Sequence, residues 1–223
     1  MKKLLMIFSF LMGSTRVGYA QAKGNEQLAF DNKFFISFST GPSFPIGQFA
    51  SNDINNKEAG FAKPGYTLNL DFTYKINPSV ILDINILYAR FDLSNMVLQQ
   101  AGLSSDHWQY YGLLVGPRYD MRLGNKSLLS IKGLLGITNV NSPAFHYDST
   151  LVIQEGWAAA FAMQFGTDYR YGISKNFFLI ADLDYTYMFP TLQVSSTDGT
   201  GPATVKQNIA AFSLTVGIGI NFQ

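Results

Sequence analysis

Apolar and polar positions alternate along most of the chain, beginning near Asn32. In Gly65–Ile76, every second residue is Tyr, Leu, Phe or Ile, and the residues between them are Thr, Asn, Asp and Lys. Successive side chains of a strand point to opposite faces, so this pattern predicts a strand with one apolar and one polar face. Trp157–Tyr169 and Phe212–Phe222 repeat the pattern. Five further strands are expected at Lys33–Gly41, Val80–Arg90, Gln109–Arg122, Leu128–Thr138 and Phe177–Met188.

The connections between these segments are alternately short and long. Outer-membrane barrels have short periplasmic turns, long external loops and an even number of strands of about ten residues each. The sequence therefore predicts an all-β fold, an eight-stranded antiparallel up-and-down transmembrane β-barrel, in a single domain. The short turns are expected at Asn77–Ser79, Leu123–Lys126 and Gly172–Asn176, and the long loops at Pro42–Pro64, Phe91–Trp108, Asn139–Glu155 and Phe189–Gln207.

The volume of such a barrel decides which face is inside. An eight-stranded barrel is only just wide enough for side chains to fill it, so we expect the bulky apolar rows to face lipid and the small and polar rows to face the lumen. A secreted lipocalin-like binder with an apolar interior is the alternative. Pro117 lies within an expected strand, where a bulge beside Gly116 or an early strand end would accommodate it. Apolar residues interrupt the polar rows at Phe35, Leu87, Leu114, Leu134, Phe178 and Ile180.

Composition and the N-terminal residues agree with export to a membrane. Hydrophobic residues make up 47% of the chain and charged residues 14%, against about a quarter in ordinary domains. The charged start, the apolar run Leu4–Met12 and the small residues before Gln21 predict a signal peptide at 1–20. A segment at 21–32 and the barrel at 33–223 follow. The near-neutral charge excludes a basic nucleic-acid surface, and the absence of cysteine excludes disulfides and thiolate metal sites.

Charged residues are concentrated on the polar face near the short turns, and we expect them to form a network in the periplasmic half of the lumen. Buried charges are tolerated only when they are paired and hydrogen-bonded. The network predicts a polar plug, and a narrow ion or solute pore gated by the same pairs is the alternative. Its members are Asp71, Lys75, Asp83, Arg118, Asp120, Lys132, Asp168, Arg170, Asp182 and Asp184.

Few residues could support chemistry. A lipid-modifying enzyme in the barrel wall would need a histidine base near a serine, and His107 beside Asp106 is the candidate. The other histidine, His146, also lies at a loop margin. Asn52–Glu58 offers oxygen ligands but lacks the spacing and the glycine of a calcium loop. We therefore expect no catalytic residue, no metal and no cofactor.

Three stretches resemble a known family: Gly41–Phe49, Gly116–Tyr119 and Val216–Phe222. The chain is similar to the small outer-membrane β-barrel family abundant in Bacteroidetes, which is distantly related to the OmpA and OmpX barrels. The resemblance implies location in the outer membrane, contact with its lipids, and an assembly signal at Phe222 that is read by the barrel-assembly machinery. It implies no catalytic residue. The function expected is that of a non-enzymatic barrel whose loops bind an external ligand or protein, or whose body supports the envelope.

Overall fold

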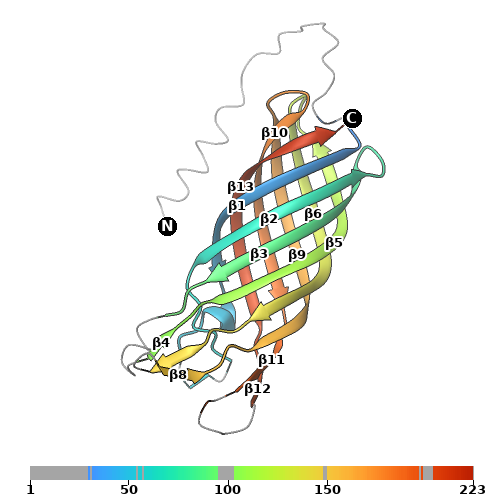
Figure 1. The fold of residues 1–223 in the computed structure, drawn as a ribbon. Coiled ribbons are helices and arrows are strands. Elements are labelled where there is room, and N and C mark those ends of the chain that lie inside the picture. The colour runs from blue at the N-terminus through green and yellow to red at the C-terminus, as the bar shows by residue number, and fades with distance from the viewer. Residues whose placement is uncertain are drawn as a thin grey trace, which may run out of the picture.

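Eight strands close into a barrel in the computed structural model (Figure 1), which describes residues 30, 32–53, 55–56, 58–94, 103–147, 150–195, 197 and 203–222. Each strand pairs antiparallel with the next one along the chain, and the first pairs with the last. The fold is therefore the up-and-down barrel that the alternation predicts. The strands are β1 (Phe34–Pro45), β2 (Gly65–Lys75), β3 (Val80–Phe91), β5 (Trp108–Arg122), β6 (Ser127–Asn141), β9 (Trp157–Gly172), β10 (Phe177–Met188) and β13 (Ile209–Phe222).

The bulky apolar rows face outward. On β2, Tyr66 and Tyr74 are exposed, whereas Asn69, Asp71 and Thr73 between them are buried in the lumen. On the other strands too, bulky apolar residues form the exposed row, and the buried row holds the charged and polar residues together with two groups of apolar residues. This orientation contradicts the lipocalin-like alternative, which requires the apolar row to line the interior.

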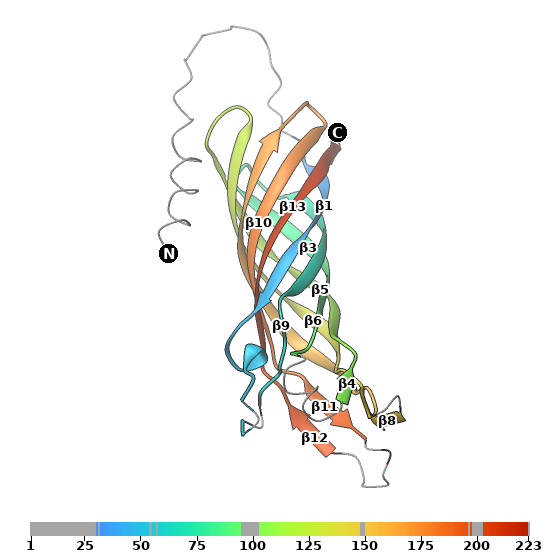
Figure 2. The same ribbon diagram turned by 90° about the vertical axis from the view of Figure 1, so that its left-hand side faces the viewer.

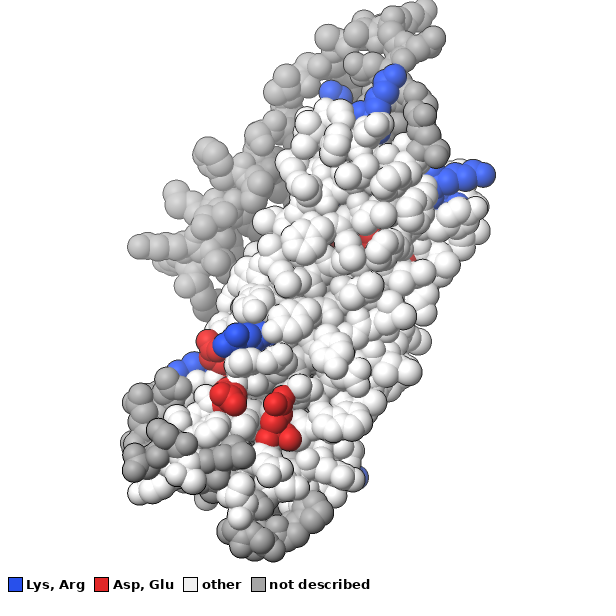
Figure 3. Space-filling model, viewed as in Figure 1, with Lys and Arg blue, Asp and Glu red and all other residues white. Residues whose placement is uncertain are grey.

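Exposed apolar residues from all eight strands form a belt on the outer surface of the barrel body. Figure 3 shows Lys and Arg at the end with the short turns, a largely white middle, and both signs of charge at the opposite end. Exposed aromatic residues lie toward both ends of the belt, such as Tyr74 and Tyr119 near the short turns and Tyr66 and Trp157 near the long connections. A neutral apolar band flanked by aromatic residues is the surface that a bilayer requires. None of the helices in the described residues is long and apolar enough to cross a membrane.

The long connections extend the barrel at its outer end (Figure 2). The first contains the helical turn η1 (Gly47–Ala50). Strands β4 (Leu103–Ser105), β7 (Phe145–Tyr147) and β8 (Thr150–Ile153) form a three-stranded sheet, and β11 (Thr191–Val194) pairs with β12 (Ala203–Lys206). The outer connections therefore carry secondary structure of their own.

At Pro117 the strand has no bulge and does not end, so the expectation of a bulge or an early end is wrong. Pairing of β5 with β3 is continuous, with Leu82 opposite Pro117. Pairing with β6 omits Gly116 and Pro117 and resumes in the same register at Arg118. The side chain of Pro117 is exposed on the outer face, where it needs no lumen space. The strand therefore tolerates the proline by losing pairing locally with one neighbour.

The expected signal peptide at 1–20 lies outside the described residues. Of the segment 21–32, the structure describes only Phe30 and Asn32. Phe30 is 4% exposed and packs inside the barrel end. The part of the chain that precedes the first strand thus contributes to the filling of the lumen.

Candidate functional site

A chain of ion pairs crosses the middle of the lumen. Arg118 Nη2 lies 2.8 Å from Asp83 Oδ2, and Arg118 Nε lies 3.4 Å from Asp168 Oδ2. The other oxygen of Asp168 accepts a hydrogen bond of 2.9 Å from Arg170 Nε. Arg170 Nη2 donates to Asp120 Oδ1 at 2.5 Å. Asp168 therefore links the two arginines, and the ion pairs join residues from β3, β5 and β9.

Lys132 forms a second group of ion pairs. Its Nζ lies 3.0 Å from Asp184 Oδ1 and 3.8 Å from Asp182 Oδ1. Asp182 also accepts a hydrogen bond of 3.0 Å from Thr215 Oγ1. A β-carbon at Gly166 would lie 1.9 Å from Asp184 Oδ1 and 2.9 Å from Lys132 Cε, so the missing side chain makes the space for this pair.

Carboxylates outnumber cations in the lumen. Asp71 has hydrogen-bond donors in place of a cation, with Asn85 Nδ2 at 2.8 Å and Ser37 Oγ at 3.4 Å. Among the described residues, six buried aspartates face three buried cations, an excess of three formal negative charges. Lys75 lies at the end of β2, where its ammonium group donates to the carbonyl oxygen of Phe30, and it is only partly buried. The charged layer is thus buried and negative overall.

An apolar layer lies in the lumen at the end with the short turns. Phe178 packs edge-on against Phe30 at 5.8 Å and against Phe35 at 6.1 Å between ring centroids. The guanidinium of Arg170 lies over the ring of Phe35 at 4.9 Å, so the charged layer rests directly on this inner apolar layer. A β-carbon at Gly219 would lie 2.0 Å from the Phe178 ring. The inner apolar layer consists of Phe30, Phe35, Ile81, Leu128, Phe178 and Ile180.

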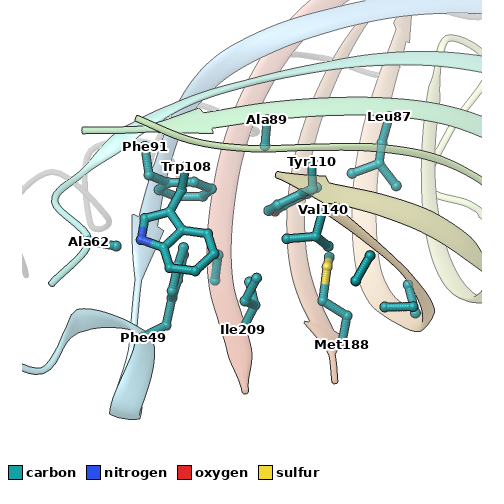
Figure 4. Packing of buried hydrophobic residues seen from close by; sticks show 14 of the residues in the cluster. Phe49, Ala62, Leu87, Ala89, Phe91, Trp108, Tyr110, Val140, Met188 and Ile209 are labelled. Atoms are coloured by element: carbon teal, nitrogen blue, oxygen red, sulfur yellow. The ribbon is translucent and has the colours of Figure 1, made fainter. Parts of the chain in front are cut away.

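A larger apolar layer lies at the outer mouth (Figure 4). Phe49, from the helical turn η1, is fully buried there and contacts Phe91 and Trp108, with ring centroids 5.2 and 5.7 Å apart. Ala158, Ala160 and Ala162 face the same layer from β9, and their small size leaves room for the aromatic rings. The outer apolar layer therefore combines barrel residues with a residue from the first external connection.

Hydrogen bonds join the external connections to one another. Trp108 Nε1 donates to the Gly60 carbonyl at 2.9 Å. Gln207 Nε2 donates to the Glu58 carbonyl at 3.0 Å, and the Gln154 amide donates to the Ser195 carbonyl at 3.0 Å. The described parts of all four external connections are thereby held together over the outer apolar layer, and we call this assembly the loop platform.

The two histidines of the chain lie at the rim of the barrel and in the connections beyond it. His107 contacts the side chain of Gln109, and no hydrogen bond joins it to a hydroxyl or carboxylate among these residues. It lines an open polar pocket of about 410 Å³ with Lys63, Arg90, Asp92 and Ser105, among others. His146 lies on β7 opposite Ser104. Ser149, which is close to His146 in the sequence, lies outside the described residues.

The described part of Asn52–Glu58 holds its own oxygen atoms in turns. Asp53 Oδ1 accepts from the Asn55 amide at 2.9 Å, and Asn56 Oδ1 accepts from the Glu58 amide at 3.0 Å. In the part of the chain that the structure describes, no group of three or more His, Cys, Asp or Glu residues could hold a metal ion. Phe222 ends β13 with 42% of its surface exposed, on the lipid-facing wall, and contacts Phe34.

Sequence reasoning missed the closing role of several residues. Phe35, Leu87, Leu114, Leu134, Phe178 and Ile180 interrupt the polar rows, and all six belong to the two apolar layers. Phe35, Phe178 and Ile180 lie near the start of their strands, whereas Leu87, Leu114 and Leu134 lie further inside theirs, so the position within the strand marks only the first three. For Phe30 and Phe49, which lie outside the barrel strands, alternation carries no signal.

A closed eight-stranded barrel with an apolar belt and a polar lumen defines a bacterial outer-membrane β-barrel protein, located in the outer membrane. No protein-family model matches the chain, and no curated protein matches its sequence. Solved structures do match its fold. Neisserial surface protein A is 14% identical with a TM-score of 0.55, and the match covers 85% of this chain and 97% of that one.

Two further structures are similar. A major outer membrane protein from Thermus thermophilus is 14% identical with a TM-score of 0.54, over 85% of this chain and 99% of that one. Ail, the attachment invasion locus protein of Yersinia pestis, is 17% identical with a TM-score of 0.50, over 86% of this chain and 99% of that one. At these identities the shared property is the fold. The narrower resemblance to the Bacteroidetes group stays a prediction.

Proposed function

We propose that this protein is a non-conducting, non-enzymatic outer-membrane barrel that presents the loop platform to partners outside the cell. The observation that carries the proposal is the filling of the lumen by a charged layer between two apolar layers. Ions would have to displace paired charges and two sets of packed aromatic side chains to cross it. The hydrogen bonds among the external connections support the second part, because a pre-ordered surface loses less conformational entropy on binding.

Planar-bilayer recordings test the closed lumen. The refolded barrel is expected to give no step-like currents. A double variant, Phe49→Ala with Phe178→Ala, removes one ring from each apolar layer and should increase the frequency of openings. Phe44→Ala with Phe177→Ala is the matched control, because both rings face outward. Regular current steps through the unaltered protein that disappear in an Arg118→Ala variant would refute the proposal.

The negative excess of the charged layer favours one form of the alternative, a narrow pore. Six buried carboxylates against three cations would attract cations and repel anions along any open path. Currents in the opened double variant should therefore be cation-selective. Anion selectivity would show that the charged layer does not line the path.

The lipid-modifying alternative depends on His107. Its contact with Gln109 supports a structural role at the rim of the barrel. Lipid A mass spectra from wild-type and His107→Ala cells are expected to be identical. A lipid A species that is lost in the variant, while the barrel reaches the outer membrane at its normal level, would establish the enzyme.

The family resemblance also implies that Phe222 is a signal read by the barrel-assembly machinery. The exposed ring on the last strand is accessible to a partner that recognises the strand end. A Phe222→Ala variant should reach the outer membrane in smaller amounts in cells, and yet refold normally into vesicles in vitro. Equal losses in both assays would assign Phe222 to stability alone.

A further inference from the structure

The loop platform encloses an apolar pocket of about 210 Å³ above the outer apolar layer. Residues from all four external connections or the strand ends beside them line it. Phe61 comes from the first connection, Leu93 from the second, Phe145 from the third, and Leu192 and Val205 from the fourth. Such a pocket forms only when the four connections are folded together.

The polar groups at its edge already have partners within the protein. Trp108 Nε1 donates to the Gly60 carbonyl, and Ser142 Oγ accepts from the Gly156 amide at 2.9 Å. Gln207 Nε2 donates to the Glu58 carbonyl. What the pocket offers to a ligand is therefore chiefly apolar surface.

Buried residues of the outer apolar layer form the floor of the pocket. Trp108 and Leu192 line the pocket and also belong to the outer apolar layer, where they are 7% and 1% exposed. Phe49, fully buried in the same layer, packs against Trp108. A molecule that enters from outside would meet this packed layer before the lumen.

We propose that this pocket is a binding site for a small apolar molecule, the size of a substituted benzene ring, taken from the external medium. An apolar cavity of about 150 Å³ can bind benzene, so the volume here suits a slightly larger molecule. Water in the pocket would find few free hydrogen-bonding groups, and its displacement by an apolar ligand is favourable. This inference rests on the proposed function, because it gives a ligand class to the loop platform.

The two tryptophans of the chain provide a direct assay. Trp108 lines the pocket, whereas Trp157 is 72% exposed on the outer wall. In nanodiscs, iodobenzene quenches tryptophan on contact. The Trp157→Phe variant, which keeps Trp108, should show saturable quenching. The Trp108→Phe variant, which keeps Trp157, should show only the linear quenching expected from partitioning into lipid.

A filling variant and its control locate the site. With Trp108 as the reporter, Val205→Phe occupies pocket volume and should weaken the saturable quenching at least about tenfold, the effect of losing about 1.4 kcal/mol. Val216→Phe makes the same change on the lipid-facing wall of β13, where valine is 64% exposed, and should leave the quenching unchanged. Linear quenching of Trp108, or equal effects of the two variants, would overturn the proposal.

Nanodisc lipids of two chain lengths separate a free ligand from a lipid tail. The midpoint of Trp108 quenching should be the same in both lipids. A midpoint that follows the lipid would assign the pocket to an acyl chain and overturn the proposal for an external molecule. The quenching results are independent of the planar-bilayer recordings. A negative quenching result would therefore refute the binding site without refuting the proposal of a closed lumen.

Discussion

Replacing Lys132 by Met should destabilise the barrel more than any exposed charge change. The Lys132 ammonium group is fully buried and lies 3.0 Å from Asp184 and 3.8 Å from Asp182. Met is unbranched and only one atom shorter than lysine, so the change removes the charge while keeping most of the packing. The excess of buried carboxylates over cations increases from three to four.

Removing one partner of a buried ion pair costs about 3–5 kcal/mol, since the other partner stays buried without compensation. With a urea m-value of about 2 kcal/mol/M, a loss of about 4 kcal/mol lowers the unfolding midpoint by about 2 M. Replacing both partners, as in Lys132→Met with Asp184→Leu, should recover most of the loss, because an apolar pair of similar volume is often as stable as the ion pair.

Reversible urea unfolding in lipid vesicles, followed by tryptophan fluorescence and by heat-modifiable gel mobility, measures these differences. Lys126→Met is the matched control, because Lys126 is exposed in a short turn and its loss should cost within about 0.5 kcal/mol. A midpoint for Lys132→Met within error of this control would refute the reasoning. So would a double variant that is less stable than Lys132→Met alone.

Three further predictions concern the space at Gly166, the anchoring of the first external connection, and the side of the barrel that faces lipid. Gly166→Ala should lower the free energy of unfolding by about 1–3 kcal/mol in the same assay, because the new β-carbon meets Asp184. Gly133→Ala should lower it less, because its β-carbon would lie 3.7 Å from the Phe165 ring. Phe49→Ala should release the first external connection, so limited proteolysis should cleave within 46–64 while Phe44→Ala stays resistant; equal resistance of both would show that Phe49 is no anchor. Leu183→Lys, in the middle of the barrel wall, should lower the free energy of unfolding in vesicles by about 2–4 kcal/mol. Leu123→Lys, in a short turn, should lower it by about 0–1 kcal/mol. Equal losses for the two variants would contradict the placement of the belt in lipid.

Alternation was sufficient to predict the barrel because each of its eight strands has one face toward lipid and one toward the lumen. The strand Val80–Arg90 expected from the sequence differs from the observed β3, Val80–Phe91, by one residue. The first and last strands extend further at their outer ends, to Pro45 and from Ile209. There the row that faces the lumen becomes partly apolar, so hydrophobicity no longer distinguishes the two faces.

Pairing within the charged layer could not be predicted, because it depends on register between strands that are far apart in sequence. Arg118 contacts Asp83 on one neighbouring strand, and its second partner, Asp168, lies two strands away on the other side. Alternation places all three in the lumen but does not give their positions along the barrel axis. The placement of Phe49 in the outer mouth depends on the path of a loop, which has no periodic pattern.

Because β1 pairs with β13, every strand of the barrel has two neighbours, and no strand lies at an edge. Phe34 is paired with Phe222, so the two ends of the folded unit are neighbours at the same rim. A short linker could join them, and new ends could then be opened at the exposed turn between Gly124 and Asn125 without changing any strand neighbour. The order of strands around the cylinder, and not the point at which synthesis begins, would then define the molecule.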